Sequence, residues 1–82
     1  MEIKQSELLE RARLGVLKFI SDRGGSAQLS DIHEFSEKKF FIAHRGFSRL
    51  MDAMVTDGLI DFDFISNTAT LTETGRGFVA PA

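Results

Sequence analysis

The sequence predicts an α+β fold in which three helices precede a two-stranded hairpin and a short final helix. Up to Asp57, apolar residues recur with the period of an amphipathic helix, and after Gly58 the period changes to the two-residue alternation of a strand. Glycines stand where the first and third helical patterns end, which is typical of helix C-termini. Because no repeat or linker interrupts these segments, we expect a single domain over residues 1–82.

The first helix is expected to begin at Ser6, a favourable N-cap residue, and to end at Gly24 and Gly25. Its apolar stripe consists of Leu9, Ala12, Val16, Phe19 and Ile20. Leu14 points nearly opposite this stripe with Leu17 beside it, and Ile3 would join them if the helix extends back. Two explanations for these apolar residues remain open. A C-terminal segment around Phe78 and Val79 could cover them, or they could form a dimer seam.

The second and third helices follow a possible short strand at residues 27–29. Ser30 can cap the second helix, which is expected to be short. The third helix is expected from about Ile42 to Asp57, with Gly58 as a left-handed C-terminal residue. Its apolar stripe consists of Ala43, Phe47, Leu50, Met51 and Met54.

The hairpin is predicted from two stretches in which apolar residues alternate with aspartates and then with threonines. Placing Phe64 opposite Ala69 and Phe62 opposite Leu71 puts every apolar side chain on one face. This register leaves residues 65–68 as a four-residue turn, a common length for a hairpin.

Thr72 is then expected to cap a final short helix that runs through Val79. The predicted order of elements is that of a winged helix: helix, possible strand, helix, helix, hairpin and short helix. In that architecture the helices hide the single apolar face of the hairpin, which explains why a small chain can bury its sheet.

Two segments carry a resemblance to a known family. FSRLMDAMVTDGLI at residues 47–60 resembles the second half of the recognition helix and the start of the wing in MarR-like winged-helix regulators. LTETGRGFV at residues 71–79 is similar to the segment that closes their wing. The resemblance implies a transcription regulator that reads duplex DNA, usually as a homodimer, with its third helix in the major groove.

The composition limits which classes of protein the chain can belong to. The chain has 82 residues, a net charge of −2 and no cysteine, which excludes disulfides and thiolate metal sites. A secreted domain this small usually needs such cross-links, so we expect a cytoplasmic protein. We expect neither a signal peptide nor a membrane span, because no apolar run approaches ~18 residues.

Charge is segregated along the chain. Between Lys38 and Met51 there are four cations and no carboxylate, whereas from Asp52 to Gly75 there are five carboxylates and no Lys or Arg. The chain is not basic overall, so DNA binding would depend on the local cationic window.

The outward face of the third helix is expected to carry Arg45, Ser48 and Arg49, with Asp52 beside them. Arginine can bind guanine through two hydrogen bonds, and serine can bind a base edge or a phosphate. Such contacts concentrate in the N-terminal half of a recognition helix. The predicted DNA contacts are Lys38, Lys39, His44, Arg45, Ser48, Arg49, Asn67 and Arg76.

An alternative reading is a protein-interaction module with an acidic wing. The family usually carries Arg or Lys at the wing tip, whereas here Ser66, Asn67 and Thr68 follow Asp61 and Asp63. The carboxylates would repel a nearby phosphate backbone. The adjacent aromatics at positions 40 and 41 cannot both face inward easily, so one is a candidate for a partner surface.

No arrangement of residues indicates an enzyme. The sequence offers no Ser-His-acid set, no paired catalytic carboxylates and no glycine-rich phosphate loop, so no catalytic residue and no cofactor are predicted. His33 and His44 are expected to lie too far apart for a metal site, and no further His at helical spacing accompanies either one.

Overall fold

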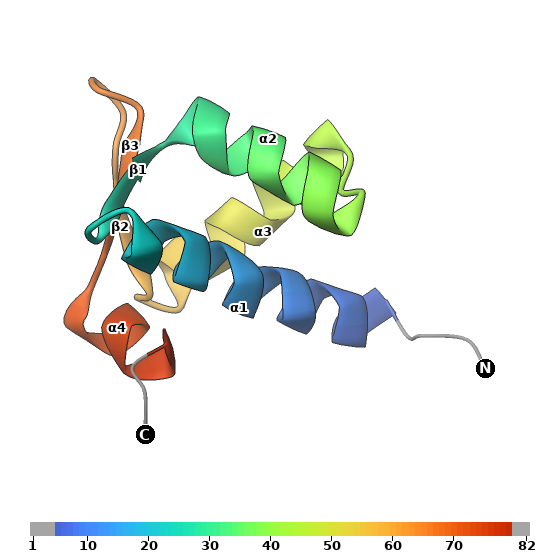
Figure 1. Cartoon of the computed structure of the whole chain (residues 1–82), viewed down its shortest axis with the longest axis horizontal. Helices are drawn as coiled ribbons and strands as arrows, with labels where there is room; N and C mark the ends of the chain where they lie inside the picture. The colour runs from blue at the N-terminus through green and yellow to red at the C-terminus, as the bar shows by residue number, and fades with distance from the viewer. Residues whose placement is uncertain (1–4, 80–82) are drawn as a thin grey trace.

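The computed structural model describes residues 5–79, with side chains from Leu9 onward, as four helices and a three-stranded antiparallel sheet. In chain order the elements are α1 (Gln5–Asp22), β1 (Ser26–Gln28), α2 (Leu29–Phe40), α3 (His44–Thr56), β2 (Ile60–Asp63), β3 (Thr68–Leu71) and α4 (Glu73–Val79). The sheet stands at one end of the molecule, α1, α2 and α3 extend from one side of it, and α4 lies beneath α1 (Figure 1). This α+β arrangement is compatible with a winged helix.

The glycines that follow α1 and α3 end these helices as expected. Gly58 has a φ of 74°, and its N–H donates to the carbonyl of Val55 at 3.0 Å. The next amide, of Leu59, donates to the carbonyl of Met54 at 2.9 Å. These two bonds satisfy the last carbonyls of α3 in a Schellman motif. Gly24 repeats the geometry after α1 with a φ of 85°.

The link between α2 and α3 differs from the prediction. α2 runs to Phe40, further than the short helix we expected, and Phe41 then adopts a left-handed φ of 57°. Ala43, expected on the apolar stripe of α3, is exposed because its extended backbone places it at the N-cap, before the helix begins. Ile42 is buried instead and supplies the apolar side chain at this end of the helix.

The sheet contains one strand more than the two-stranded hairpin, because β1 pairs with β3 and confirms the possible strand near residue 27. The predicted hairpin register was wrong by two residues: Phe62 lies opposite Ala69, and Ile60 lies opposite Leu71. The turn therefore spans residues 64–67, and Phe64 lies outside the strand. A shift of two residues keeps the same side chains on the buried face, so the alternation pattern fits either register.

The side chain of Asp63 explains the register. Its Oδ1 atom accepts hydrogen bonds from the amides of Ile65 at 2.9 Å and Ser66 at 3.4 Å. Asparagine and aspartate side chains often start turns in this way. Asn67 completes the turn with a left-handed φ of 53°, which asparagine tolerates better than most residues. These contacts start the turn directly after Asp63.

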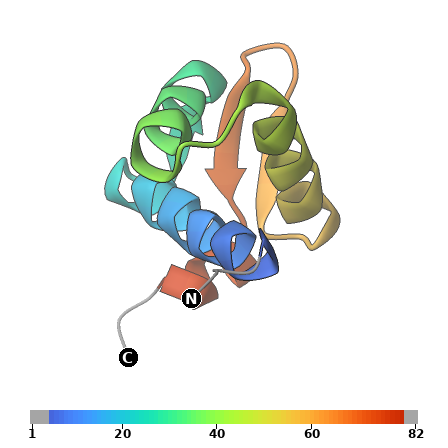
Figure 2. The same cartoon turned by 90° about the vertical axis from the view of Figure 1, so that its right-hand side faces the viewer.

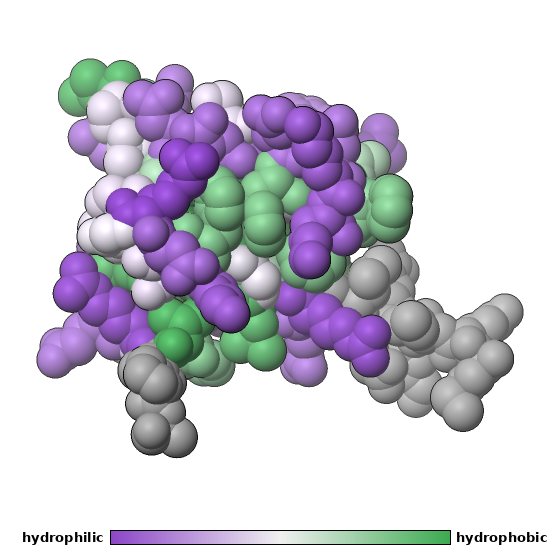
Figure 3. All heavy atoms as spheres, in the orientation of Figure 1, coloured by the Kyte–Doolittle hydropathy of each residue, from purple (hydrophilic) through white to green (hydrophobic). Residues whose placement is uncertain are grey.

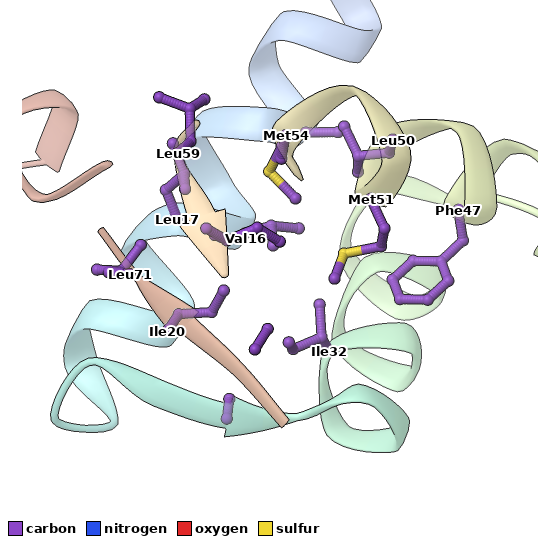
Figure 4. Packing of buried hydrophobic residues seen from close by; sticks show 14 of the residues in the cluster. Val16, Leu17, Ile20, Ile32, Phe47, Leu50, Met51, Met54, Leu59 and Leu71 are labelled. Atoms are coloured by element: carbon purple, nitrogen blue, oxygen red, sulfur yellow. The ribbon is translucent and has the colours of Figure 1, made fainter. Parts of the chain in front are cut away.

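The core lies where α1, α2, α3 and the sheet converge. Figure 4 shows Val16, Leu17 and Ile20 of α1 meeting residues from the other elements. The α3 stripe residues Phe47, Leu50, Met51 and Met54 are buried as predicted. Leu9 was expected on the α1 stripe but is partly exposed. The cluster packs α1, α2 and α3 against the sheet. This packing fixes which face of α3 stays exposed.

Of the residues predicted for a dimer seam on α1, Leu17 requires a correction. Leu17 is fully buried within one copy as a member of the core cluster, beside Leu59 (Figure 4), and α4 also packs against α1. Leu14 remains 48% exposed, and Ile3 lies outside the described residues.

Among residues 5–79, none of the helices combines the length and apolar character that a bilayer-spanning segment needs.

Candidate functional site

The outward face of α3 carries the side chains predicted to contact DNA. Arg45, Ser48 and Arg49 are exposed, and the opposite face of the same helix is buried against the core. Neither arginine takes part in any of the ion pairs found among the described side chains. The two guanidinium groups are therefore available to a partner, and Asp52 and Thr56 share the same exposed side of the helix.

The position of α3 is fixed by contacts at both of its ends. At the C-terminal end, Arg13 of α1 pairs with Asp57 at 3.3 Å. At the N-terminal end, the buried ring of Phe47 packs edge-on against His33 of α2 at 4.7 Å. Arg49 lines a hollow between α3 and α1 that Arg13 also lines, and its side chain is exposed.

Lys38 and Lys39 lie in the last turn of α2, and both are exposed. Only residues 41–43 separate this turn from α3, so the two lysines stay close to the start of that helix. The Nζ of Lys38 lies 2.8 Å from a carboxylate oxygen of Glu34. This pairing raises the pKa of Lys38 and lowers the pKa of Glu34. Lys38 is thus partly neutralised, whereas Lys39 joins none of the ion pairs found among the described side chains.

The start of α3, the start of α2 and the hairpin turn surround a second hollow. His44 and Asn67, both predicted as DNA contacts, line it together with His33. The backbone carbonyl of Asn67 accepts the amide of Leu29 at 2.8 Å, which ties the turn to α2. His44 and Asn67 are exposed, so their side chains are accessible beside α3.

The two histidines are closer together than predicted. The ring centroids of His33 and His44 lie 5.5 Å apart, because the short link folds the first residue of α3 back beside α2. The Nε2 atom of His33 is buried without a hydrogen-bond partner, and its ring packs edge-on against Phe47 at 4.7 Å. Within the described side chains, no set of three or more metal-ligating residues forms.

Arg76 lies apart from the other predicted contacts. It is exposed on α4, where its guanidinium group lies beside Gly25, after the end of α1. β3 separates α4 from the hairpin turn, so Arg76 and Asn67 are at opposite ends of that strand (Figure 1). The structure therefore brings together the α3 residues and their neighbours but leaves Arg76 outside this group.

Sequence reasoning missed an apolar groove between α3 and the hairpin. The groove has a volume of about 380 Å³, and Met51, Val55, Phe62 and Phe64 line it. The rings of Phe62 and Phe64 pack edge to face at 4.9 Å. One signal was present in the sequence, because Val55 is an apolar residue that the α3 stripe leaves out.

The hairpin turn is apolar at its tip, where Phe64 is 84% exposed and Ile65 is 97% exposed. The hydrophobic surface at the upper left of Figure 3 lies at the hairpin tip. Phe41 is also 89% exposed, whereas Phe40 packs against Phe35. This confirms the expectation that one of the adjacent phenylalanines is exposed.

The chain matches no family model, no curated protein and no solved structure. The resemblance of residues 47–60 and 71–79 to MarR-like regulators thus stays a prediction, and function is argued from the site alone.

Proposed function

We propose that this protein is a winged-helix transcription regulator of the MarR-like kind, which reads duplex DNA by placing α3 in the major groove. The observation that supports this most strongly is the position of Arg45 and Arg49. Both side chains are exposed on the face of α3 opposite the core, in the half of the helix nearest its N-terminus, and neither has an ion-pair partner among the described side chains.

The chemistry of this face suits base recognition. A guanidinium group can donate two hydrogen bonds to the O6 and N7 atoms of guanine, and the hydroxyl of Ser48 can bond a base or a phosphate. Asp52 on the same face can accept a hydrogen bond from the amino group of cytosine. A helix that carries both donors and an acceptor discriminates among base pairs rather than binding phosphate alone.

Neighbouring cations support the orientation of the DNA. Lys39, in the last turn of α2, is positioned to contact a phosphate while α3 lies in the groove. The hairpin contributes little electrostatic attraction, because no Lys or Arg occurs between Asp52 and Gly75. We therefore expect a shallow dependence of the binding constant on salt, set by a few contacts on and beside α3.

The test starts with selection from a pool of randomised duplexes, because the operator is unknown. Binding of the selected duplex is then measured by fluorescence anisotropy at several salt concentrations. The double variant Arg45→Ala/Arg49→Ala is expected to bind at least about tenfold more weakly, because each base-contacting arginine is worth about 1–3 kcal/mol. Its logarithmic salt slope is expected to fall as well, because cationic contacts to the duplex are lost.

A matched control is Arg11→Ala/Lys18→Ala, which removes the same charge from the exposed side of α1. This variant is expected to retain the affinity of the unmodified protein. The proposal is overturned if no duplex shows salt-dependent binding, or if the α1 control weakens binding as much as the α3 variant does.

A further inference from the structure

The sheet has two edge strands, β1 and β2, and the edge at β2 borders the apolar groove. Its strand order is β1-β3-β2, so β2 (Ile60–Asp63) pairs with β3 on one side, and no other strand among residues 5–79 pairs with its other side. Along an edge strand, alternate backbone N–H and C=O groups point away from the sheet. These groups can accept an additional strand by the same hydrogen bonds that join β2 to β3.

The apolar groove lies along this edge, between β2 and α3. Side chains of neighbouring strands project to the same face of a sheet in register. An added strand would therefore direct every second side chain the same way as Phe62, into the groove lined by Met51, Val55 and Phe64. The groove offers these side chains apolar surface that the core of the protein leaves uncovered, since Phe64 is 84% exposed and Val55 is 44% exposed.

The opposite face of the same strand is acidic. Asp61 and Asp63 alternate with Ile60 and Phe62, and both carboxylates are exposed. Their cross-strand neighbours on β3 are threonines, and neither aspartate joins an ion pair among the described side chains. The remaining side chains of an added strand would have Cβ atoms about 5 Å from those of the aspartates, where Lys or Arg would gain an attractive cross-strand interaction.

We infer that the β2 edge is a docking site for an extended peptide segment in which apolar residues alternate with basic ones. The apolar side chains fill the groove against α3, the basic side chains pair with Asp61 and Asp63, and the backbone of the peptide extends the sheet by one strand. Three features coincide to define this occupant: the unpaired edge, the apolar groove beside it and, on its other face, carboxylates that join no ion pair among the described side chains.

A second copy of this chain does not fit the same edge. Antiparallel pairing of β2 with β2 of another copy would bring the aspartates of both chains to the same face of the joined sheet. Like charges directly opposite one another are destabilising, so Asp61 and Asp63 oppose self-association and favour a partner of the opposite charge.

The docking site goes beyond the proposed DNA-binding function; Ser48 and Asp52 line its groove, but the two arginines of α3 do not. Arg45 and Arg49 do not line the groove, and Arg49 instead lines the hollow on the α1 side of α3. Variants can therefore separate the two activities. Arg45→Ala/Arg49→Ala is expected to leave peptide binding unchanged, so failure of the DNA-binding proposal and failure of this inference give different results.

The test uses the full chain and a fluorescent hexapeptide of alternating valine and lysine. Matched peptides replace lysine by glutamate, or carry N-methyl groups on alternate amides and so lose the backbone donors of one edge. Binding is measured by anisotropy, and amide chemical shifts locate the site. The valine–lysine peptide is expected to bind and to shift the amides of residues 60–64, while both matched peptides bind at least about tenfold more weakly.

Asp61→Lys is the main variant, because it leaves the turn contacts of Asp63 in place. It is expected to weaken the valine–lysine peptide about tenfold and to strengthen the valine–glutamate peptide. Val55→Glu is expected to weaken binding of both by placing a charge in the groove. Asp22→Lys makes the same charge change as Asp61→Lys at an exposed site on α1 and is expected to leave peptide binding unchanged.

The inference is overturned by any of three results. The valine–lysine peptide fails to bind, its affinity withstands Asp61→Lys or backbone N-methylation, or the amides of residues 60–64 show concentration-dependent shifts that reveal self-pairing at this edge. Amide spectra of each variant establish that the fold is retained, so that a loss of binding is assigned to the site.

Discussion

Gly75 shows how a single residue fixes the position of α4. A side chain at this position would overlap the backbone carbonyl of Leu59, which approaches the helix where Gly75 has only hydrogen. The adjacent contacts reinforce the approach, since Thr72 caps α4 through the amide of Gly75 at 3.0 Å, and the amide of Thr72 donates to the carbonyl of Leu59 at 3.0 Å. The start of α4 is thus held against the residue that leads into β2.

We therefore predict that Gly75→Ala lowers the free energy of unfolding by about 2–3 kcal/mol, because backbone must move to admit the methyl group. Gly77→Ala is the matched control in the same helix, since nothing lies within 4 Å of the added carbon. It is expected to raise the free energy of unfolding by up to about 1 kcal/mol, because alanine favours a helix over glycine. Urea unfolding of both variants measures the difference, and equal stabilities would contradict the close approach.

Phe41 is an exposed aromatic residue in a conformation that costs energy. Its left-handed φ of 57° is unfavourable for a bulky side chain, at about 1–2 kcal/mol, and its ring contributes almost no burial in return. We predict that Phe41→Asn increases the free energy of unfolding by about 0.5–1 kcal/mol, because asparagine tolerates this backbone conformation.

The neighbouring residue provides the contrast for this prediction. Phe40 is partly buried, packs edge-on against Phe35 and lies against Gly15 of α1. Phe40→Asn is expected to lower the free energy of unfolding by about 2–3 kcal/mol, as the loss of a partly buried aromatic side chain implies. Thermal unfolding distinguishes the two, and a Phe41→Asn protein that melts below the unmodified protein would show that the exposed ring has a stabilising contact.

At the scale of secondary structure elements, the sequence predicted what depends on local chemistry. The four helices follow from the apolar period and the Gly58 cap from its residue type, which act within a few positions of one another. Ser6 and Ser30, expected as N-caps, instead lie inside α1 and α2. The hairpin register was missed because a shift of two residues leaves the alternation intact. The Asx-type bonds of Asp63, rather than hydrophobicity, decided it, and such bonds have only a weak sequence signature.

The candidate site also has parts that could be predicted from the sequence and parts that could not. The outward position of Arg45, Ser48 and Arg49 was predictable, because it follows from the helical period of the buried stripe on the same helix. The proximity of His33 to His44 and the groove beside Val55 were not predictable. Both depend on how closely α3 approaches α2 and the hairpin, which is a property of tertiary packing.

The turn after β2 gives a pH-dependent prediction for the hairpin as an element. Hydrogen bonds from the amides of Ile65 and Ser66 lower the pKa of Asp63 below its ordinary value of 3.8. A group whose pKa is lowered by folding stabilises the fold above its unfolded pKa, and this stabilisation is lost as the pH falls through the lower folded value. The turn is therefore expected to weaken in acid.

Asp63→Asn removes the titration while keeping an acceptor oxygen at the turn. The unmodified protein is expected to be the more stable of the two at neutral pH, with the difference shrinking as the pH falls below 3.8. Chemical unfolding across the acid range measures this difference, and the chemical shift of the Asp63 carboxyl carbon reports the folded pKa directly. Parallel acid profiles for the two proteins would show that the turn does not depend on the charge.

At the scale of the whole molecule, exposed apolar side chains gather at two separate ends of the protein. The hairpin tip lies at one end of the sheet, and α4 lies at the other, packed against α1 (Figure 2). Leu14 on α1 and Phe78 on α4 are 48% and 53% exposed. Hydrophobic surface is visible where α4 meets α1, at the lower edge of Figure 3. This second surface lies away from the hairpin groove.

We propose that the α1–α4 surface joins two copies of the protein around a two-fold axis, which is the commonest symmetry of soluble oligomers. Leu14 is the residue to change, because Leu17 is buried within each copy.

Leu14→Glu is expected to convert the dimer to a monomer in sedimentation equilibrium, because two carboxylates would face each other in an apolar contact. Affinity for a duplex with two half-sites should then fall by about 100-fold, since the second contact is no longer intramolecular, whereas affinity for a single half-site should stay the same. Ser21→Glu adds the same charge at an exposed position of α1 and is expected to leave both values unchanged. A Leu14→Glu protein that binds the two-site duplex as tightly as the unmodified protein would place the dimer contact elsewhere, because disruption of the true interface must cost the avidity that two linked helices provide.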